Sequence, residues 1–505
     1  MRRVPVMLAV LALAACKVEV EGARCATPGT VTDCPEGQAC GNDGRCSERA
    51  AACLATRCDV GATRCTGDDL QTCTDADATC GRWDTRSCSA EGLLCVKRGG
   101  NPHACECPAN ATAEFTADPL GSPSGAVPYP TGIDSPRVCR YRRLRDALDA
   151  AVAHGGTVTV RAHGAPGEAV SFGIATGESF PIVVSEGVTL VGASAPGETT
   201  IDGDGAGTGV SIVRVEGGTV ERVRIANVSM ANATGAELVC GAATGSTLRD
   251  VTVTASAQPF ATGVSVRGNC GAVLQRVDAS AASGAALDVA VGAGVQVTVS
   301  GSRLHGSGTG VDAVGGVLTF QKDGMVATEV TDNAGRGIHL GGATVVDATL
   351  DGLLVARNGG TGIVVEAPST SRLSMTSCEV HSNAATTPTP YGPVGNVRGA
   401  GGVLLVQSAL LGGFQFANNR IYANDGGANA DGLAFYSNSL TWSVNTGSCD
   451  TANQFGCVRG TALAVSATGG GVDARGSKWE SIAPPVSANV VWSPECQGTV
   501  PACPP

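Results

Sequence analysis

The chain has 505 residues, which is enough for two or three domains and a large buried core. Its 71 glycines and 4% aromatic residues require a core of small, β-branched side chains, unlike that of a mixed α/β enzyme. Lys and Arg number 34 against 45 Asp and Glu, a net charge of −11, so nucleic acid is a poor partner for the chain.

The first 16 residues, MRRVPVMLAVLALAAC, have the features of a bacterial lipoprotein signal peptide. Two arginines begin it, and residues 6–12 form an apolar segment too short to span a bilayer. The end, LAAC (13–16), resembles a lipobox, which implies lipid modification of Cys16 after cleavage before it. Two or more acyl chains anchor a protein stably, and Lys17 favours the outer membrane of the cell envelope. An ordinary secretion signal is the alternative.

Cysteines are concentrated in residues 17–107, which we predict to be a Cys-rich domain of one or more disulfide-bonded modules. This segment has few apolar residues and therefore needs covalent cross-links. Zinc is the alternative, but the segment has no CxxC pair and only one histidine, His103, which favours disulfides. The segment resembles the Cys-rich modules that separate the lipid anchor from the functional domain in bacterial surface lipoproteins.

Residues 108–138 are rich in proline, glycine and serine and are predicted to be an extended linker that leads into the next domain. The stretch RRLRDALDAAVAHGG (142–156) then predicts a helix that two glycines end. Its apolar side chains fall on one face: Leu144, Ala147, Leu148, Ala151 and Val152. A strand, TVTV (157–160), follows the helix.

The rest of the chain repeats a glycine followed by a short strand of alternating hydrophobic residues, as in GIHL (337–340) and GIVV (362–365). The intervals run from 23 to 40 residues, which indicates stacked structural repeats. Short strands separated by Gly, Asn or Asp predict a solenoid of parallel β-strands. Ten coils spaced ~4.8 Å apart would make a rod of roughly 50 Å, with the helix capping the first coil.

From about residue 111 to 490 the chain resembles the right-handed parallel β-helix of the pectin-lyase-like superfamily. The helix before GGTVTV, and GESFPIVVSEGVTLVG (177–192), also resemble the start of an uncharacterised family of bacterial proteins with this fold. The resemblance implies an all-β chain in which a right-handed parallel β-helix with an N-terminal capping helix occupies residues 139–490. A small disulfide-rich domain precedes it, and a tail at 491–505 follows.

Four cysteines near the C-terminus are predicted to close the tail by two disulfides, although spacing alone does not prove connectivity. The suggested pairs are Cys449–Cys457 and Cys496–Cys503. An odd number of cysteines follows Cys16, and we assign the remaining free thiol to Cys378.

The phrases VTDNAGRGIHL (330–340) and VARNGGTGIVV (355–365) share an asparagine at the bend after a strand. The asparagines expected in this column are Asn333, Asn358, Asn383 and Asn424. Asparagine tolerates the left-handed conformation, and stacked amides can hydrogen-bond from coil to coil. We predict a structural ladder without a chemical role.

Aligning the coils on their glycines predicts one column of side chains that point to solvent. Its members are Ser211, Glu237, Ser265, Asp288, Asp312, His339, Val364, Leu404 and Ala434. Asp288 and Asp312 fall on consecutive coils, so their Cα atoms are expected ~5 Å apart. Two such carboxylates could hold Ca²⁺ or act as an acid and a base.

A second outward set precedes the asparagine bend: Arg276 and Asp278 on one coil, Arg303 and His305 on the next. Arg303 or Arg276 could neutralise a uronate carboxylate, and His305 or His339 could move a proton. The catalytic motifs of polygalacturonases and pectate lyases are missing, as is the Ca²⁺-binding nonapeptide repeat.

Because outward columns of a solenoid must be polar anyway, we favour a non-catalytic function. The favoured hypothesis is a lipid-anchored surface protein whose β-helix binds a polysaccharide or envelope component, with no cofactor beyond calcium at Asp288 and Asp312. The alternative is a polysaccharide lyase, hydrolase or epimerase that acts on an acidic glycan through Asp288, Asp312, His339 and Arg303. A third hypothesis is that the chain is a structural spacer. The long insertions at 366–401 and 436–459 lie away from the two aspartates, which favours binding over catalysis.

Overall fold

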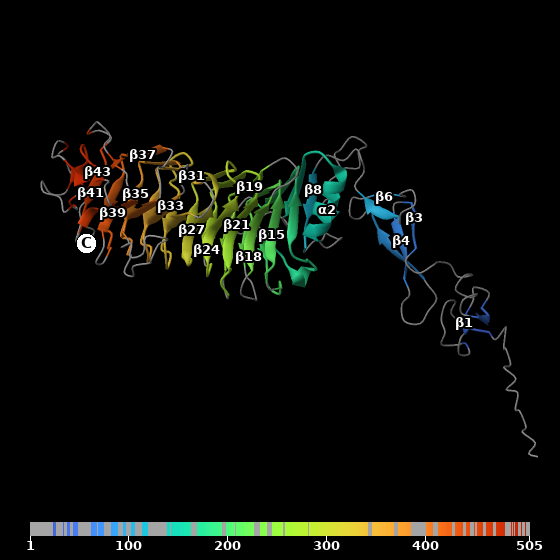
Figure 1. Ribbon diagram of the computed structural model, residues 1–505. Helices are drawn as coiled ribbons and strands as arrows, with labels where there is room; N and C mark the ends of the chain where they lie inside the picture. The colour runs from blue at the N-terminus through green and yellow to red at the C-terminus, as the bar shows by residue number, and fades with distance from the viewer. Residues whose placement is uncertain are drawn as a thin grey trace, which may run out of the picture. The chain divides into compact units, whose positions relative to one another are not determined.

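The chain forms two compact units, Met1–Pro108 and Ala109–Pro505, in the computed structural model (Figure 1). The structure describes residues 24–26, 34, 38–40, 44–48, 62–67, 69–74, 82–88, 94–96, 103–106, 114–119, 139–141, 143–162, 169–193, 198–207, 209–226, 233–239, 245–255, 258–280, 282–341, 346–367, 372–384, 400–407, 413–426, 430–437, 441–444, 449, 452–457, 461–467, 471–479, 486, 488, 490–492, 496 and 500. The predicted signal peptide and Cys16 therefore lie outside the described residues, as does Cys503. Within these ranges, no helix is long and apolar enough to cross a membrane.

The larger unit is wound from three parallel sheets, which confirms the predicted all-β parallel β-helix (Figure 1). The first sheet contains, in spatial order, β9 (Cys139–Tyr141), β8 (Glu114–Ala117), β10 (Val158–Ala162), β13 (Val188–Gly192), β16 (Thr219–Glu221), β19 (Ser246–Arg249), β22 (Ala272–Gln275), β25 (Gln296–Ser300), β28 (Gly316–Gln321), β31 (Val346–Asp351), β34 (Arg372–Thr376) and β37 (Gly413–Ala417). Each successive strand pairs in parallel with the strand one coil away, as β10 does with β13.

The other two sheets are built in the same way. The second sheet contains β11 (Val170–Phe172), β14 (Thr199–Asp202), β17 (Arg224–Ala226), β20 (Thr252–Thr254), β23 (Asp278–Ser280), β26 (Arg303–His305), β29 (Glu329–Thr331), β32 (Leu354–Ala356), β35 (Glu379–His381), β38 (Arg420–Tyr422), β41 (Gln454–Gly456) and β44 (Lys478–Trp479). The third contains β12 (Ile182–Ser185), β15 (Ser211–Glu216), β18 (Thr234–Val239), β21 (Thr262–Gly268), β24 (Ala285–Val291), β27 (Thr309–Val314), β30 (Ile338–Leu340), β33 (Ile363–Ala367), β36 (Val403–Gln407), β39 (Ala430–Ser437) and β42 (Thr461–Ala467). A small parallel sheet joins β40 (Thr441–Ser443), β43 (Gly471–Asp473) and β45 (Val490–Val491).

The core lies between the three sheets and follows from the period-two alternation of the strands. In β10, Val158, Val160 and Ala162 are buried, whereas the two residues between them are partly exposed. Small aliphatic side chains fill most of the interior, with single phenylalanines such as Phe172 and Phe320 between them. Fully burying each such side chain stabilises the fold by about 1.5–3 kcal/mol.

Helix α2 (Leu144–His154) packs against β10, β8 and β12 at the N-terminal end of this unit, as predicted for a cap. Four of the five predicted apolar positions are buried, but Val152 is 50% exposed, so the buried stripe is narrower than expected. Glu178, which lies just after the 3₁₀ turn η2 (Ile174–Thr176), accepts hydrogen bonds from the backbone N–H groups of Leu144 (2.6 Å) and Arg145 (3.2 Å). A distant carboxylate therefore caps the helix N-terminus.

The segment predicted as a linker contributes to the β-helix itself. Strand β8 lies within residues 108–138, and its Glu114 is the register partner of Thr159 in β10. The backbone of β10 would otherwise form a sheet edge, and β8 pairs with it.

Disulfides stabilise the smaller unit, as its composition predicts. Its described strands form three small antiparallel sheets: β1 (Gln38–Cys40) with β2 (Cys46–Glu48), β3 (Thr63–Thr66) with β4 (Asp69–Thr74) and β5 (Arg82–Ser87), and β6 (Leu94–Val96) with β7 (Ala104–Glu106). The disulfides include Cys25–Cys40, Cys34–Cys46 and Cys65–Cys95.

The predicted pairing of the C-terminal cysteines is wrong. Cys449 bonds to Cys496, with their Cα atoms 5.2 Å apart, so neither the 449–457 nor the 496–503 pair forms. Close spacing misleads here because a solenoid brings together residues one coil apart, and these two are separated by 47 positions. The tail is therefore tied to the preceding coils and not closed on itself. Cys378 is a free, buried thiol, as predicted.

The asparagines of the repeated phrase form a buried ladder of amide hydrogen bonds. Each side-chain Nδ2 donates to Oδ1 of the next asparagine, at 2.9 Å from Asn333 to Asn358 and 2.8 Å from Asn358 to Asn383. The bond from Asn383 to Asn424 is 2.9 Å. The left-handed residue is the one before each asparagine, as at Asp332 (φ 58°), and not the asparagine itself.

The glycine of the phrase is required by the same ladder. A Cβ on Gly362 would lie 2.8 Å from Asn383 Nδ2, 2.8 Å from Gly402 O and 2.9 Å from Val380 Cγ1. Gly310 and Gly337 face the amides of Asn333 and Asn358 in the same way. Each asparagine therefore packs over the glycine of the preceding coil.

A second, shorter ladder escaped the sequence analysis. Asn419 donates to Asn453 Oδ1 at 3.0 Å and accepts the backbone N–H of Cys378 at 3.0 Å. Cys378 thus occupies a ladder position at the bend between the first and second sheets, and its thiol donates to the carbonyl of Leu350. Burial raises the pKa of this thiol to about 12, so it remains protonated and inert.

Replacing the central asparagine of the ladder should destabilise the solenoid. In Asn358→Ala, the backbone N–H and the Nδ2 of Asn333 both lose their acceptor. Each buried donor left unpaired costs about 1–3 kcal/mol, so the free energy of unfolding should fall by about 2–4 kcal/mol. Urea denaturation measures this loss. The control is Asn418→Gly at an exposed bend position, which should change stability by less than about 0.5 kcal/mol. Equal effects in the two variants would contradict the ladder.

A single methyl group at the glycine column should also destabilise the protein. Gly362→Ala forces Asn383, Gly402 or Val380 to move, at a cost of about 1–3 kcal/mol for overpacking. Gly207→Ala is the matched control, because its Cβ would lie at an ordinary 3.7 Å from Val210 Cγ2. Thermal unfolding of both variants tests the packing, and a Gly362→Ala protein as stable as the control would refute it.

Candidate functional site

The outward positions of the third sheet form one row along consecutive coils. The strand register gives this row as Arg214, Glu237, Ser265, Asp288, Asp312, His339, Val364, Leu404 and Ala434. The predicted alignment of these residues between strands is thus correct from Glu237 onward. It is wrong at its first position, where Ser211 pairs with Thr234. Ser211 lies three residues before the position that pairs with Glu237, because Gly209 is not equivalent to Gly235.

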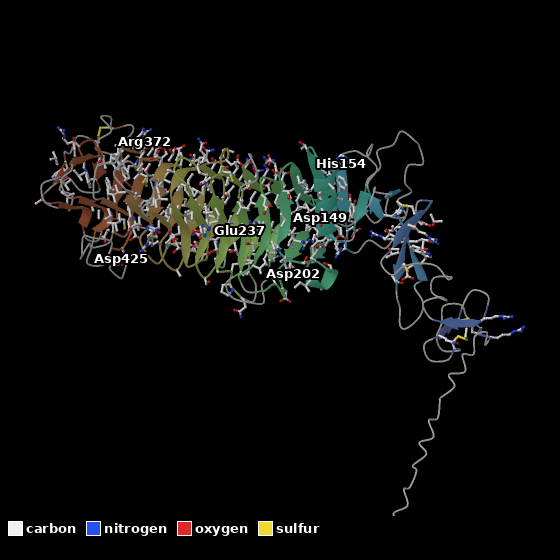
Figure 2. All side chains as sticks on the ribbon, turned by 45° about the vertical axis from the view of Figure 1, so that its right-hand side comes forward. Asp149, His154, Asp202, Glu237, Arg372 and Asp425 are labelled. Atoms are coloured by element: carbon white, nitrogen blue, oxygen red, sulfur yellow. A yellow bond between two sulfur atoms is a disulfide. The ribbon has the colours of Figure 1, made fainter. Side chains whose placement is uncertain are left out.

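Exposure divides this row into two parts. Val364, Leu404 and Ala434 are buried, although they point away from the central core, so the prediction that they face solvent is wrong. The polar part consists of Glu237, Ser265, Asp288, Asp312 and His339, and we call it the polar row. Glu237, labelled in Figure 2, begins it. Ser265 is buried, whereas the side chain of Asp312 is 49% exposed.

Neighbouring side chains hold the carboxylates of the polar row in place. Ser211 Oγ donates to Glu237 Oε2 at 2.8 Å. Arg267, which follows Ser265 on β21, forms an ion pair with Asp288. Asp312 Oδ1 lies 2.8 Å from His339 Nδ1. These contacts fix the side chains before any ligand arrives.

His339 lies between two carboxylates. Its Nδ1 meets Asp312, and its buried Nε2 lies 3.8 Å from Oε2 of Glu366, an ion-pair distance and not a hydrogen bond. Burial lowers the pKa of His339, but Asp312 and Glu366 outweigh burial and raise it to about 8. The hydrogen bond with His339 lowers the pKa of Asp312. Near neutral pH, His339 is therefore mostly protonated and Asp312 ionised.

The geometry favours ion pairs over a calcium site at Asp288 and Asp312. The two residues are register partners on β24 and β27, as predicted, but Asp288 is paired with Arg267 and Asp312 with His339. Across the described ranges, one cluster of three or more His, Cys, Asp or Glu side chains has metal-binding spacing, and it lies elsewhere, at Cys25, Cys34 and Cys46.

The other predicted catalytic residues lie on a different sheet from the polar row. Arg303 and His305 belong to β26 of the second sheet, where Arg303 pairs in register with Asp278. His305 Nε2 lies 2.9 Å from Asp278 Oδ1, and Arg303 lies 3.7 Å from Glu329. The proposed set of Asp288, Asp312, His339, Arg303 and His305 is thus divided between the outer faces of two sheets.

The prediction that Arg276 lies with Asp278 on one strand is wrong. Arg276 has a left-handed backbone (φ 51°) and lies in the bend before β23, so it falls outside the strand ladder. Its guanidinium contacts Asp250 through two nitrogens, at 2.5 and 2.9 Å, and also pairs with Asp323. A bend residue of this kind cannot be aligned by strand alternation.

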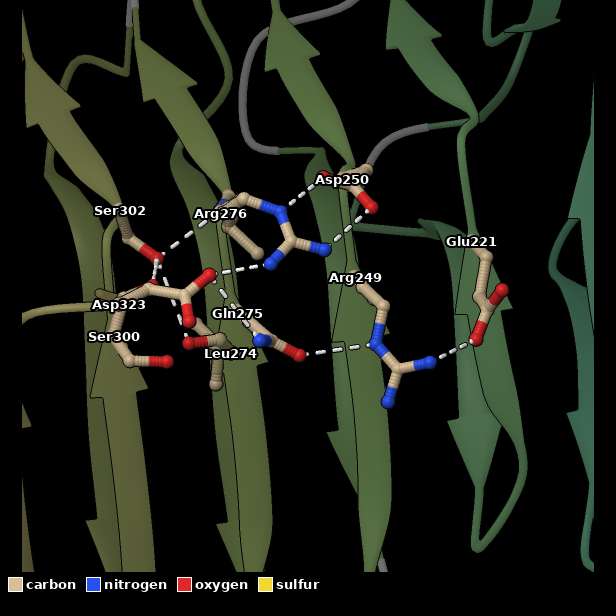
Figure 3. Close-up of polar contacts among 10 residues, drawn as sticks. Glu221, Arg249, Asp250, Leu274, Gln275, Arg276, Ser300, Ser302 and Asp323 are labelled. Carbon is tan, nitrogen blue, oxygen red and sulfur yellow. Dashed lines mark hydrogen bonds and ion pairs between the residues drawn. The ribbon is translucent and has the colours of Figure 1, made fainter. Parts of the chain in front are cut away.

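Arg276 belongs to a polar network that the sequence analysis missed (Figure 3). Arg249 donates to Glu221 Oε1 at 2.6 Å and to Gln275 Oε1 at 3.0 Å, and Gln275 donates to Asp323 at 3.2 Å. The network runs across successive coils of the first sheet. Its only sequence signal is the presence of arginine and aspartate at the end of successive strands.

One protein-family comparison agrees with the observed β-helix. Residues 238–478 match the family model described as right handed beta helix region. The A-module of mannuronan C-5 epimerase AlgE6 from Azotobacter vinelandii is a similar solved structure, at 16% identity and a TM-score of 0.38, covering 72% of this chain and 94% of that one. The A-module of AlgE4 from the same organism is similar at 14% identity and a TM-score of 0.30, covering 70% and 92%. No curated protein matches the sequence.

The stability that His339 contributes should decrease as the pH rises. Because the folded pKa of about 8 exceeds the unfolded value of 6.5, the contribution is complete below about pH 6.5 and lost through about pH 8. The difference corresponds to about 2 kcal/mol. Urea unfolding at pH 6 and pH 8.5 should show a larger loss for the parent protein than for His339→Gln. Thr349→Ala, which changes an exposed position on the first sheet, should behave like the parent, and parallel pH profiles for all three proteins would contradict this assignment.

Proposed function

We propose that the outer face of the third sheet binds a polysaccharide of the cell envelope or its surroundings without cleaving it. The binding surface consists of the polar row with its partners Arg267 and Glu366. The single observation that carries the proposal is the strict register of this row. Its carboxylate, hydroxyl and imidazole groups recur on neighbouring strands about 4.8 Å apart.

A linear polymer suits a surface of this kind because it can repeat the same contact from coil to coil. The row is also preorganised, since Glu237, Asp288 and Asp312 are each held by a neighbouring side chain. Preorganised groups lose less conformational entropy on binding. Individually weak hydrogen bonds to sugar hydroxyls can then add up along the row.

The protonation chemistry supports binding over catalysis. A general acid or base must reach the reacting atom directly or through one water molecule. Both ring nitrogens of His339 are directed at carboxylates, and its Nε2 is buried. Asp288 is neutralised by Arg267, so it is poorly suited to attack a sugar or to accept a proton.

Local charge compensation points to a neutral or weakly charged glycan as the ligand. Arg267 with Asp288, and His339 with Asp312 and Glu366, bring opposite charges together on this face. A strongly acidic polymer would need cations that are not already engaged. Hydroxyl groups can instead share the remaining lone pairs of the carboxylates.

The proposal includes attachment of the chain to the membrane. Lipidation at Cys16 would hold the protein at the bacterial outer membrane, and the disulfide-bonded unit would separate the β-helix from the lipid. The sequence MRRVPVMLAVLALAAC alone supports this attachment. Metabolic labelling with a fatty-acid probe, with Cys16→Ser as control, addresses this part separately.

Polysaccharide binding should depend on the polar row. We expect the parent protein to bind a neutral glycan from a panel of neutral and acidic polysaccharides and to leave its chain length unchanged. Asp288→Asn removes the charge that orients Arg267 and should weaken binding about tenfold, the value of one charge-assisted hydrogen bond. Affinity electrophoresis measures binding, and size-exclusion chromatography of the glycan measures cleavage.

Thr349→Ala, which removes an exposed hydroxyl from the first sheet, is the control and should bind like the parent. Depolymerisation that disappears in Asp312→Ala would overturn the non-catalytic proposal and favour a lyase or hydrolase. An equal loss of binding in Asp288→Asn and Thr349→Ala would place the binding surface elsewhere.

A further inference from the structure

The cysteines nearest the N-terminus of the smaller unit converge on one point. Strands β1 and β2 pair antiparallel with Cys40 and Cys46 as direct register partners. Side chains of such cross-strand partners lie side by side, with Cβ atoms about 4.5–5.5 Å apart. The two sulfur atoms therefore begin from neighbouring positions on one hairpin.

Each hairpin cysteine is bonded to a cysteine from the preceding segment. Cys25 bonds to Cys40 and Cys34 bonds to Cys46, with Cα separations of 5.7 and 5.6 Å. The ligand sulfur atoms of Cys25, Cys34 and Cys46 all lie within 4.8 Å of one another. Cys40 Sγ is covalently bonded to Cys25 Sγ, so all four sulfur atoms form one cluster.

The dimensions of this cluster match those of a zinc tetrathiolate. Zinc binds four cysteine sulfurs tetrahedrally at about 2.3 Å, which puts the sulfurs about 3.8 Å apart. Breaking the two disulfides lets bonded sulfurs separate to that distance, and the sulfurs of Cys25, Cys34 and Cys46 already lie within 4.8 Å of one another.

We propose that these four cysteines form a redox-controlled zinc site, which is oxidised to two disulfides or reduced and occupied by one Zn²⁺ ion. A dithiol supplies the reduction: two dithiol molecules deliver four electrons and four protons, break both S–S bonds and become disulfides themselves. Zinc then displaces the four thiol protons and binds four thiolates. This inference concerns the smaller unit and does not depend on the glycan-binding proposal.

Two arginines flank the cluster. Arg24 precedes Cys25 and Arg45 precedes Cys46, and the two form an antiparallel backbone bridge with each other. Both residues are exposed. A zinc ion with four thiolates carries a net charge of −2, so nearby guanidinium groups favour both thiolate formation and the metal-bound state.

Other disulfides in the described residues lack this arrangement. Cys65–Cys95 and Cys449–Cys496 each provide two sulfur atoms, and neither belongs to a cluster of three or more candidate ligands there. They serve as internal controls, because reduction exposes their thiols without creating four converging ligands.

Zinc binding by the full chain after reduction tests the proposal. The protein is reduced with a phosphine, freed of excess reagent under nitrogen and titrated with Zn²⁺ alone, with bound metal counted by native mass spectrometry. Replacing zinc by Co²⁺ should give the visible absorption of a tetrahedral cobalt thiolate. The oxidised protein should bind no zinc, and the reduced protein should bind about one zinc ion per chain at this cluster.

Two substitutions separate metal binding from disulfide bonding. Cys34→Ser should lower the zinc content by about one ion per chain, whereas Cys34→His should restore it, because histidine can bind zinc but cannot form a disulfide. Cys65→Ser should bind zinc like the parent. If the reduced chain binds no zinc, or if Cys34→Ser and Cys65→Ser bind equally, the proposal is wrong.

Discussion

The stacking of one coil on the next is the constraint on which the rest of the larger unit depends. Parallel strands satisfy their backbone groups only in register with both neighbours, and the bends between sheets must keep the same spacing. The asparagine ladder meets this requirement at one bend, since each amide bonds both to the next asparagine and to a backbone carbonyl of the preceding coil. The position that faces each asparagine must be glycine, because a Cβ there would collide with the side-chain amide.

The same stacking produces rows of aligned side chains on the surface. A residue that points outward on one coil is matched by the register partner on the next, so a polar residue repeated along the chain becomes a continuous line. On the third sheet this line carries carboxylates whose charges are balanced by Arg267 and His339. Its chemistry is therefore set jointly by a member of the row, His339, and by Arg267 and Glu366, which lie two positions beyond the row on their strands.

The two units are stabilised by different physical means. The β-helix buries columns of valine, isoleucine, leucine and alanine, whereas the smaller unit has few apolar residues and depends on disulfides. Stabilisation by disulfide bonds depends on the redox state, but stabilisation by the burial of apolar side chains does not. Reduction would therefore change the smaller unit and leave most of the β-helix core intact, so the proposed redox-dependent metal site is compatible with a β-helix that stays folded.

Local pattern was sufficient to predict the coil repeat, the capping helix, the outward row from Glu237 to His339 and the asparagine column, because these depend on side-chain alternation and bend chemistry within one coil. The partners of that row, Arg267 and Glu366, and the pairing of Cys449 with Cys496 depended on the tertiary structure. So did the register of Arg214 and the bend position of Arg276. The physical reason is that contacts between coils join residues 20 or more positions apart, and inserted or missing residues at any bend change which side chains meet.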